Sequence, residues 1–549
     1  MDLRTNKIGI FVIGAGISGI ACANRLLELN KDYAVTILEA SDRYGGRLRT
    51  LKNFTNFDIE LGGEEIHGSN SLYYELVKKS GGNPFGYWDQ NIIYTSFNGK
   101  LCSFENSNIP EVKKVEDLFE EVSYQFKEEF EDITLRDYLI KNKFSEDVYH
   151  LANAMIGVEA GTDLDSISIG GFSKVCKLWK AGEDNFLITN MSHVEIIEKA
   201  FPAAINNIIL NCVINKISLT KENEVVISDK DNNIYCGNKC VLTVPITQLK
   251  NNSIEFCPPF NEEKTKAINS IKMDSCAKLI LKLKKSFWPE NTCWLLLKGN
   301  VNCYWPTAQG KNSNEIVLSA LVTGRGCDNL RNLYKEDRNK FIANVIEDLE
   351  SGFNLTDLKN DLIDYFWFDW ASTPFIEGGY TYASVGEGES RDIAKLPINN
   401  TIYFGGEAFA RNGHYATIHG AIESGIEAAE ELHRYYCQSI MSNETPIKTH
   451  NIPKATPTKT TPRKHETSEQ KHKKEDEINE TPKKEKASVC KVIHVHQDED
   501  DEDGADNNKE KKKVVTKREV SSRKVRSVSN DEFSKYENML NTKKTRTKK

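Results

Sequence analysis

The chain begins with an apolar run that is followed by apolar residues at helical spacing. Residues 8–13 (IGIFVI) are almost entirely apolar and end at Gly14. Over 17–29 the apolar residues recur every three or four positions, and 34–38 (AVTIL) form a second apolar run. A strand, a helix and a second strand in this order predict a βαβ unit with parallel strands.

Further along, the pattern alternates between strand and helix periods. Short alternating runs over 206–250, separated by polar turns, predict a small antiparallel meander. Residues 331–352 place Phe341, Val345 and Leu349 on one face and predict a helix. A strand over 401–404 (TIYF) and a helix over 415–435 follow. The chain is therefore predicted to have an α/β fold.

After Tyr436 the pattern ends. Pro, Thr, Lys and Glu dominate, and Phe533 and Tyr536 are the only aromatic residues. Such a segment cannot bury enough apolar surface to offset its ordering entropy. Residues 440–549 are therefore predicted to form a disordered, charged tail.

Charge is divided unevenly along the chain. Residues 1–440 hold 45 Lys+Arg against 60 Asp+Glu, and 441–549 hold 27 against 20. An acidic body attracts small cations, while a basic tail attracts nucleic acid or chromatin. We expect a nuclear location from the tail, with a cytoplasmic location as the alternative. No apolar run is long enough to span a bilayer, so no membrane partner is expected.

Gly14, Gly16 and Gly19 form a GxGxxG turn between the first strand and the helix. The glycines permit a tight turn and close approach of a diphosphate, and the helix N-terminus, which includes Ser18, offers free N–H groups. Glu39 ends the second strand, where a carboxylate accepts hydrogen bonds from ribose hydroxyls. The spacing predicts a dinucleotide site.

Residues 39–50 (EASDRYGGRLRT) resemble the E-A-x-x-R-x-G-G-R-x-x-T signature of the flavin amine oxidase family. The resemblance extends over most of 7–436. The further matches are 59–63 (IELGG), 241–245 with 256–260 (VLTVP and FCPPF), 287–289 (FWP), 405–407 (GGE) and 419–425 (HGAIESG).

The resemblance implies that FAD is the cofactor. The implied cofactor-binding residues in the signature are Arg43 and Arg47, which would face the diphosphate, and Gly46, where the chain passes close to the flavin. Gly62, Gly406, Glu407, Trp370 and Thr417 complete the implied set.

The same resemblance implies a Rossmann-like FAD-binding domain interleaved with an α+β substrate domain. The FAD-binding domain would be assembled from 1–85, 186–265 and 370–437. The substrate domain would take 86–185 and 266–369.

Enzymes of this family transfer a hydride from an amine carbon to flavin N5, and O2 then reoxidises the flavin to give H2O2. The family lysine corresponds to Lys278, which would hold a water near N5. Lys278, Lys282 and Lys284 also share one strand face, so a solvated face is the alternative interpretation.

Two residues flank the substrate in this family, and they correspond to Tyr380 and Thr417. Monoamine oxidases have a tyrosine at the second position, whereas the family's histone lysine demethylases have threonine. Gly379 occupies the place of the cysteine that binds flavin covalently in monoamine oxidases. Non-covalent FAD is therefore expected, and no metal site is expected.

Polyamine oxidases carry GAxWIHG in front of the flavin, and this chain reads GGEEIHG over 62–68. His67 matches the family histidine, and Glu65 replaces the tryptophan. Glu64 and Glu65 are predicted to bind the distal ammonium of a polycation, and Glu159 and Asp163 could add charge.

We therefore expect a polyamine as the substrate. One alternative is a demethylase-like chromatin enzyme, although that branch carries a SWIRM domain and a long helical tower, neither of which is found in this sequence. Another is a flavin-bearing scaffold whose tail carries the function.

Overall fold

The computed structural model describes residues 7–87, 91–105, 107–125 and 129–443, and every structural statement below concerns these residues. They belong to the first of two units, Met1–His450. Residues 444–549, most of the predicted tail, lie outside the described residues.

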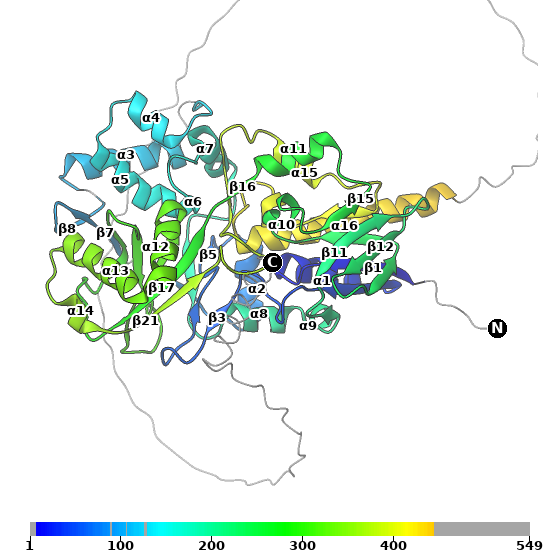
Figure 1. The fold of residues 1–549 in the computed structure, drawn as a ribbon, viewed down its shortest axis with the longest axis horizontal. Helices are drawn as coiled ribbons and strands as arrows, with labels where there is room; N and C mark the ends of the chain where they lie inside the picture. Colours follow the sequence, from blue (N-terminus) through cyan, green and yellow to red (C-terminus); the bar gives the residue numbers. More distant parts are fainter. Residues whose placement is uncertain (1–6, 88–90, 106, 126–128, 444–549) are drawn as a thin grey trace, which may run out of the picture. The chain divides into compact units, whose positions relative to one another are not determined.

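The predicted βαβ unit forms the centre of a five-stranded parallel sheet (Figure 1). Strand β1 pairs with β2 on one side and with β14 on the other. The order across the sheet is β10-β2-β1-β14-β23. Its elements are β1 Ile8–Ile13, α1 Ile17–Leu29, β2 Tyr33–Leu38, β10 Ile208–Ile209, β14 Lys239–Leu242 and β23 Ile402–Phe404. The predicted first helix and strands are confirmed.

Helix α16 (Ile418–Asn443) packs against α1. A Cβ added to Gly425 would lie 2.1 Å from the carbonyl oxygen of Ser18. The two helices therefore meet at backbone distance, which holds the end of the described chain against the start of the fold.

The meander predicted over 206–250 is only partly right: its middle strands form a four-stranded sheet in the order β13-β12-β11-β15, while its first and last runs, β10 and β14, join the parallel sheet instead. Strands β11, β12 and β13 pair antiparallel, and β15 joins β11 in parallel. The strands are β11 Ile214–Leu219, β12 Val225–Asp229, β13 Ile234–Gly237 and β15 Glu255–Cys257.

A seven-stranded sheet lies on the opposite side of the view in Figure 1 and has the order β21-β17-β20-β19-β18-β7-β8. Its strands are β7 Ile92–Phe97, β8 Lys100–Ser103, β17 Cys276–Leu283, β18 Thr292–Leu296, β19 Cys303–Pro306, β20 Ile316–Thr323 and β21 Leu362–Asp369. Strand β17 has β20 and β21 on its two sides, so it is a central strand.

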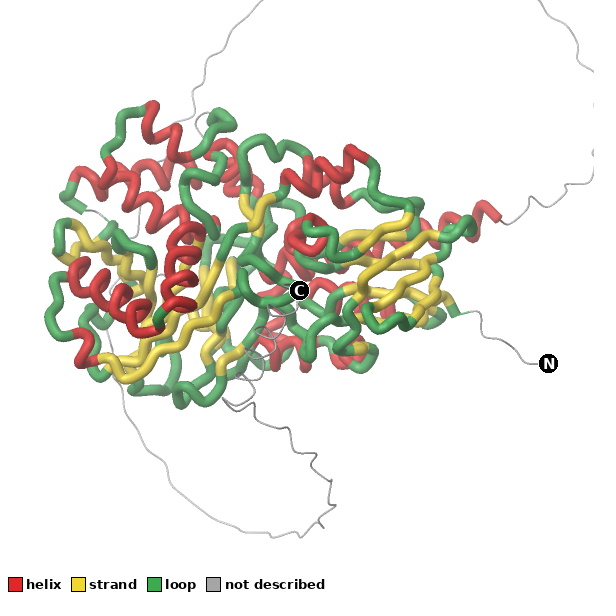
Figure 2. The backbone as a smooth tube through the Cα atoms, in the orientation of Figure 1, coloured by secondary structure: helices red, strands yellow, loops and turns green. Residues whose placement is uncertain are grey.

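Short strand pairs and helices surround these sheets (Figure 2). The short strands are β3 Thr50–Leu51, β4 Ile59–Glu60, β5 Ile66–His67, β6 Pro84–Gly86, β9 Asn185–Ile188, β16 Lys272–Met273 and β22 Thr381–Tyr382. The helices up to β9 are α2 Leu72–Lys79, α3 Pro110–Glu120, η1 Glu121–Gln125, α4 Leu135–Lys141, α5 Glu146–Ala152, η2 Asn153–Gly157, α6 Val158–Ala160 and α7 Ile169–Leu178. The later ones are α8 His193–Ala200, α9 Pro202–Ile205, α10 Ile246–Lys250, α11 Glu262–Ser270, α12 Gly324–Glu336, α13 Arg338–Phe353, α14 Leu358–Asp361, α15 Ser390–Lys395 and η3 Glu407–Phe409.

The prediction of a single helix over 331–352 is wrong, because the structure has two helices there, divided at Asp337. The side chain of Asp337 accepts hydrogen bonds from the N–H groups of Asn339 and Lys340 and so caps a new helix, α13. The buried face of that helix is as predicted, since Phe341, Val345 and Leu349 are fully buried.

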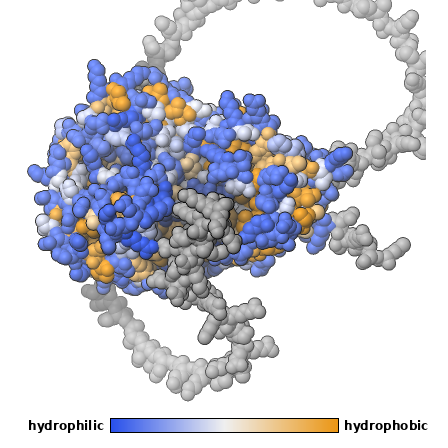
Figure 3. Space-filling view, viewed as in Figure 1, coloured by the Kyte–Doolittle hydropathy of each residue, from blue (hydrophilic) through white to orange (hydrophobic). Residues whose placement is uncertain are grey.

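The strands of the five-stranded sheet all come from the segments predicted for the FAD-binding domain. The strands of the seven-stranded sheet all come from the segments predicted for the substrate domain. The domain boundaries themselves remain a prediction. Hydrophilic residues cover much of the face drawn in Figure 3, with apolar residues in patches between them.

Candidate active site

The glycine turn between β1 and α1 requires glycine at two positions. Gly14 has a φ of +101°, which side chains other than glycine rarely adopt. A Cβ added to Gly19 would lie 2.0 Å from the carbonyl oxygen of Gly14. The turn is therefore tight enough to bring the start of α1 directly over the end of β1.

The N-terminus of α1 has both room and unused donors for a ligand. Gly16 is its N-cap and makes no side-chain capping bond, and a Cβ added there would meet no atom within 4 Å. The hydroxyl of Ser18 is buried and has no hydrogen-bond partner among the described residues. A diphosphate fits these features, since the first N–H groups of a helix attract anions.

The carboxylate of Glu39 is fixed beside this turn at the end of β2. Its Oε2 accepts a hydrogen bond from the N–H of Ala15 at 2.6 Å, and its Oε1 accepts one from the N–H of Ser41 at 2.9 Å. The predicted contact of Glu39 with ribose stays a prediction.

The two arginines of the signature donate hydrogen bonds to the protein itself. Nη1 of Arg43 donates to the carbonyl oxygens of Tyr44 at 3.0 Å and Leu48 at 3.1 Å, so this side chain braces the loop around Gly46. Nη1 of Arg47 donates to the carbonyl oxygen of Gly379 at 2.8 Å and bonds Glu407 at 2.9 Å. The predicted diphosphate role of both arginines therefore remains untested, and the contacts seen are internal.

Glu407 is a buried anion at the start of η3, directly after Gly406. Its Oε2 accepts hydrogen bonds from the hydroxyl of Thr381 at 2.7 Å and the N–H of Ala416 at 3.0 Å. Burial opposes its ionisation, but the charge of Arg47 and these hydrogen bonds lower the pKa of Glu407. Its charge thus ties together segments that are far apart in the sequence.

Gly62 and Trp370 pack against each other. A Cβ added to Gly62 would lie 1.7 Å from the carbonyl oxygen of Arg47 and 3.1 Å from the Trp370 ring. The indole N–H of Trp370 donates to the carbonyl oxygen of Leu61 at 2.8 Å. Trp370 therefore supports the segment that leads to Glu64, and its predicted flavin contact stays a prediction.

Lys278 is buried, so the solvated-face interpretation is wrong for this residue. Its side chain is 1% exposed and its Nζ lies 2.5 Å from Oε2 of Glu64. Nζ also lies 4.3 Å from the ring centre of Trp305. These partners come from distant segments, and β17 is covered on the face that carries Lys278.

Glu64 and Glu65 have different partners. Glu64 pairs with Lys278 inside the protein. This contact departs from the prediction that Glu64 binds substrate, because its carboxylate already has a cation. Glu65 instead lies near His67, with 3.9 Å between Oε2 and Nδ1. Nδ1 of His67 is also 2.8 Å from Oδ1 of Asn185.

A second carboxylate, Glu159, shares this region. Glu159 is accessible to solvent, yet burial raises its pKa, the charge of His67 opposes the rise, and the charge of Glu65 adds to it. Glu65 and Glu159 are thus near enough for their charges to interact. Among the described residues, no lysine or arginine forms an ion pair with Glu65 or Glu159. Asp163, in contrast, is engaged by Arg325 at 3.2 Å, so it adds no unpaired charge.

Tyr380 is held next to Glu159. Its hydroxyl donates to the carbonyl oxygen of Val158 at 2.8 Å. A Cβ added to Gly161 would lie 2.4 Å from the Tyr380 ring. Burial raises the pKa of Tyr380, and the charges of Glu159 and Glu65 raise it further.

Gly379, which precedes Tyr380, has no space for a side chain. An added Cβ would lie 2.5 Å from the Cβ of Cys276. A cysteine at this position, as in enzymes with covalent flavin, would not fit without a backbone shift.

Thr417 is the N-cap residue of α16. Its hydroxyl accepts a hydrogen bond from the N–H of Gly420 at 3.0 Å and donates to the carbonyl oxygen of His414 at 2.7 Å. This contact explains the residue structurally, while its predicted place beside the substrate stays a prediction.

A cluster that the sequence did not predict lies at the start of α16. The rings of His414 and His419 are 4.6 Å apart, and Trp179 lies 5.2 Å and 5.3 Å from them. Burial is the main cause that lowers the pKa of His419 to about 2, and the charges of His414 and His67 lower it further, so the ring is neutral. His419 could be found from its HGA motif, but no sequence signal marks Trp179.

No described helix is long and apolar enough to cross a membrane. Likewise, within the described ranges no group of three or more His, Cys, Asp or Glu side chains is placed to hold a metal ion.

The fold and the site define a dinucleotide-binding oxidoreductase: a glycine turn with an open helix N-terminus, joined to a second sheet that presents a buried lysine. The chain belongs to the flavin-containing amine oxidoreductase family, whose family model matches residues 17–164 and 194–433. It is a flavin-dependent amine oxidase with FAD as cofactor, and the open space at Gly16 and the unpartnered hydroxyl of Ser18 fit that cofactor.

Two kinds of relative share this similarity. Polyamine oxidase 3 of Oryza sativa subsp. japonica is 25% identical over 461 residues, which cover 78% of this chain and 90% of that protein. Lysine-specific histone demethylase 1B of Mus musculus is 26% identical over 464 residues, which cover 77% of this chain and 52% of that protein.

Solved structures give the same fold. Cyclohexylamine oxidase from Brevibacterium oxydans superposes with a TM-score of 0.66 at 17% identity, covering 78% of this chain and 99% of the other. Putrescine oxidase bound to putrescine has a TM-score of 0.65 at 17% identity, with the same coverage. The predicted α/β fold and family are confirmed.

Proposed function

We propose that this amine oxidase acts on a polyamine. The main support is the pair of Glu65 and Glu159, whose charges act on each other and on Tyr380 and which have no lysine or arginine partner among the described residues. Two neighbouring carboxylates with no fixed cation favour a ligand that brings positive charge. A polyamine supplies such a charge at a distance from its reacting nitrogen.

FAD, when bound, accepts the hydride from the amine carbon and passes two electrons to O2. The chain's own residues have three roles in this proposal. Glu65 and Glu159 bind the distal ammonium, Tyr380 forms one wall of the reacting site, and Lys278 orients a water. The reacting nitrogen must be neutral, so kcat/KM is expected to rise with pH as the amine deprotonates.

We also infer that FAD is bound without a covalent link, because Gly379 has no room for the linking cysteine. FAD should therefore leave the protein on acid or heat denaturation. Flavin absorbance that stays with the precipitated chain would contradict this inference.

The test of the substrate is a pair of charge-removing variants, Glu65→Gln and Glu159→Gln. Each should raise KM for spermine about tenfold, equivalent to about 1.4 kcal/mol of binding, and leave KM for a monoamine little changed. Glu146→Gln, at an exposed surface carboxylate paired with Arg136, is the matched control. Unchanged spermine KM in both variants would remove the polyamine proposal.

A demethylase activity is the second candidate, because Thr417 matches that branch and its members are among the relatives. A methylated histone tail is also polycationic, so charge alone does not separate the two. Spermine and a dimethyl-lysine histone peptide should be offered together, with peroxide and formaldehyde both measured. Formaldehyde without peroxide from spermine would reverse the assignment, and turnover of neither would favour the flavin-bearing scaffold.

The nuclear location and the nucleic-acid or chromatin contact depend on residues outside those the structure describes. We propose that the basic segments at 509–518 and 523–549 carry both. Deleting 440–549 should reduce DNA retention and nuclear localisation while leaving amine turnover unchanged. Unchanged retention and localisation would refute the proposal.

A further inference from the structure

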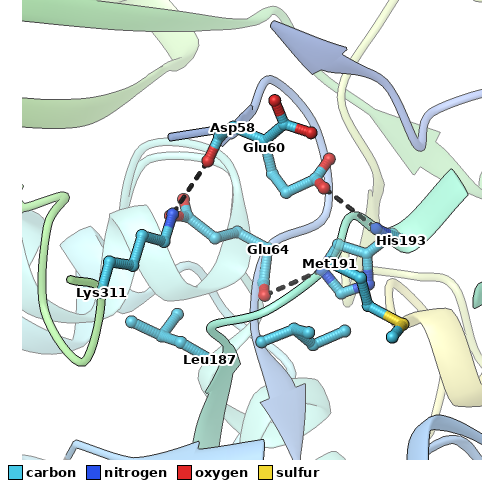
Figure 4. A pocket seen from close by; sticks show the side chains of 8 residues that line it. Asp58, Glu60, Glu64, Leu187, Met191, His193 and Lys311 are labelled. Atoms are coloured by element: carbon cyan, nitrogen blue, oxygen red, sulfur yellow. Dashed lines mark hydrogen bonds between the residues drawn. The ribbon is translucent and has the colours of Figure 1, made fainter. Parts of the chain in front are cut away.

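A recess lies beside Lys278, and the proposed function does not use it. It is small, and its polar lining residues, Asp58, Glu60, Glu64, His193 and Lys311, are all ionisable (Figure 4). The recess is therefore chemically unlike an ordinary packing defect, whose walls are apolar.

Glu64 is the residue that joins Lys278 to this recess. Its carboxylate contacts Lys278, and the residue is itself part of the recess wall. Lys278 is 1% exposed and does not line the recess. Among the residues that line the recess, Glu64 is therefore the one that bonds Lys278.

Lys311 is the second cation near Glu64. Its Nζ donates to the carbonyl oxygen of Asp58 at 3.0 Å (Figure 4). Burial raises the pKa of Glu64, but the charges of Lys278 and Lys311 outweigh it, so the net pKa is lowered. Burial in turn lowers the pKa of Lys311. Glu64 is thus an anion between two lysines, of which Lys311 gives up its proton more readily than an exposed lysine.

Two further ionisable groups of the recess, Glu60 and His193, lie on β4 and α8. Glu60 accepts a hydrogen bond from the N–H of His193 at 3.0 Å, and Nε2 of His193 is 3.0 Å from the carbonyl oxygen of Glu64. Burial raises the pKa of Glu60 to about 8. The hydrogen bond from His193 opposes this rise, and the charge of Glu64 adds to it. Burial lowers the pKa of His193 to about 4, so its ring is neutral at pH 7.

We propose that Glu64, with Lys311, forms a proton path between the recess and Lys278. The proposal rests on the oxidase chemistry proposed above. Reduction of O2 to H2O2 takes two electrons and two protons: the hydride from the amine carries both electrons and one proton, and the second proton must come from solvent. Lys278 passes that proton to the reacting oxygen, and Glu64 returns one to Lys278 from Lys311 and the recess.

This proposal gives Glu64 a positioning and proton-transfer role in place of substrate binding. It predicts that loss of Glu64 affects the oxygen half-reaction and its pH dependence, while KM for the amine is little changed. If Glu64 instead bound the substrate, its loss would raise KM for the amine and leave the oxygen half-reaction little changed.

The experiment uses the holoprotein, reduced with dithionite and mixed with O2 in a stopped-flow instrument between pH 6 and 9. Glu64→Gln should slow flavin reoxidation at least about tenfold, and added imidazole should restore part of the rate, as for other lost proton donors. Lys311→Met should slow it several-fold and displace its pH profile. Lys282→Met is the matched control, because Lys282 lies on the same strand and pairs with Glu315 away from the recess.

A readout that needs no turnover is the midpoint potential of the bound flavin. Glu64→Gln leaves the charge of Lys278 without its partner, so the potential should rise, whereas Lys282→Met should not change it. Normal reoxidation in Glu64→Gln with a raised amine KM would overturn the proposal. If Glu64→Gln fails to retain FAD, Lys311→Met decides, and an unchanged pH profile in that variant would overturn it.

The experiment distinguishes failure of the polyamine assignment from failure of the proton path. Dithionite reduces the flavin without any amine, so the oxygen half-reaction can be measured even if spermine does not reduce the enzyme. In that case the polyamine assignment fails while the proton path is still tested.

Discussion

At the scale of single residues, Glu64 and Glu65 show how far neighbours in sequence can diverge in role. Glu64 pairs with buried Lys278, and Glu65 lies beside His67 and Glu159. In the sequence alone they look like one acidic pair. Their separation depends on Lys278 and Trp305, which are more than 200 positions away in the chain, so periodicity could not reveal it.

Glu60 should make stability fall as pH rises. Its pKa is about 8 in the fold against an ordinary 4.5, so between these values the native state binds more protons than the unfolded state. The free energy of unfolding therefore decreases as pH rises through this window. Each pKa unit corresponds to about 1.4 kcal/mol, so the loss amounts to a few kcal/mol.

The measurement is urea denaturation of wild type and Glu60→Gln at pH 5 and pH 8.5. Because glutamine does not ionise, the variant should lose the decline and exceed wild type at pH 8.5. Glu222→Gln, at an exposed turn, is the control. Parallel pH profiles for wild type and Glu60→Gln would contradict the burial of an ionisable Glu60.

Gly161→Ala should displace Tyr380. The new Cβ would lie 2.4 Å from that ring, and the backbone φ of Gly161 is +76°. Gly81→Ala is a matched control, because Gly81 has a φ of +83° and no atom within 4 Å of an added Cβ. Both variants carry the same kind of backbone strain, and only Gly161→Ala disturbs the site.

The expected result is a kcat/KM at least about tenfold lower in Gly161→Ala, since small displacements of a reacting site cost large factors in rate. FAD content should be normal in both variants. Equal activity in the two would show that the Tyr380 ring position does not matter for turnover.

At the scale of elements, local signals predicted what local interactions determine. The run over 8–13, the spacing over 17–29 and the glycine turn gave β1, α1 and the start of the cofactor site. The break at Asp337 was missed because apolar spacing continues across it, and only the capping hydrogen bonds show the boundary. The solvated-face alternative for Lys278 failed for another reason, since a central strand has no exposed face when side chains from other strands and loops cover it.

The cap of α13 gives a test at this scale. Asp337→Ala should lower the free energy of unfolding by about 1 kcal/mol, because two N–H groups at the helix start lose their acceptor. Asp337→Asn should retain most of the stability. Thermal unfolding of the three proteins distinguishes these outcomes, and equal melting temperatures for the alanine variant and wild type would mean that the cap contributes nothing.

At the scale of the whole molecule, charge should govern how fast a polyamine arrives. Residues 1–440 carry 45 Lys+Arg against 60 Asp+Glu, a net charge of −15. A polycation is steered toward such a surface, and salt screens the attraction. The value of kcat/KM for spermine should therefore fall several-fold between 20 and roughly 300 mM salt.

A monoamine substrate is the control, because its single charge should make the salt effect smaller. Steady-state peroxide release at a fixed pH measures both. Equal salt dependence for the two substrates would show that steering by the body contributes little to specificity.

The five-stranded sheet also has a consequence for the protein's synthesis. Strand β1 is complete at Ile13, but its neighbour β14 ends at Leu242 and β23 ends at Phe404. At bacterial and eukaryotic elongation rates, roughly 20 to 80 s separate the first strand from the last. During that interval the nascent chain has its glycine turn without the elements that pack around it. We therefore expect flavin capture to be a late event in biosynthesis, and a chain released before α16 to lose its cofactor.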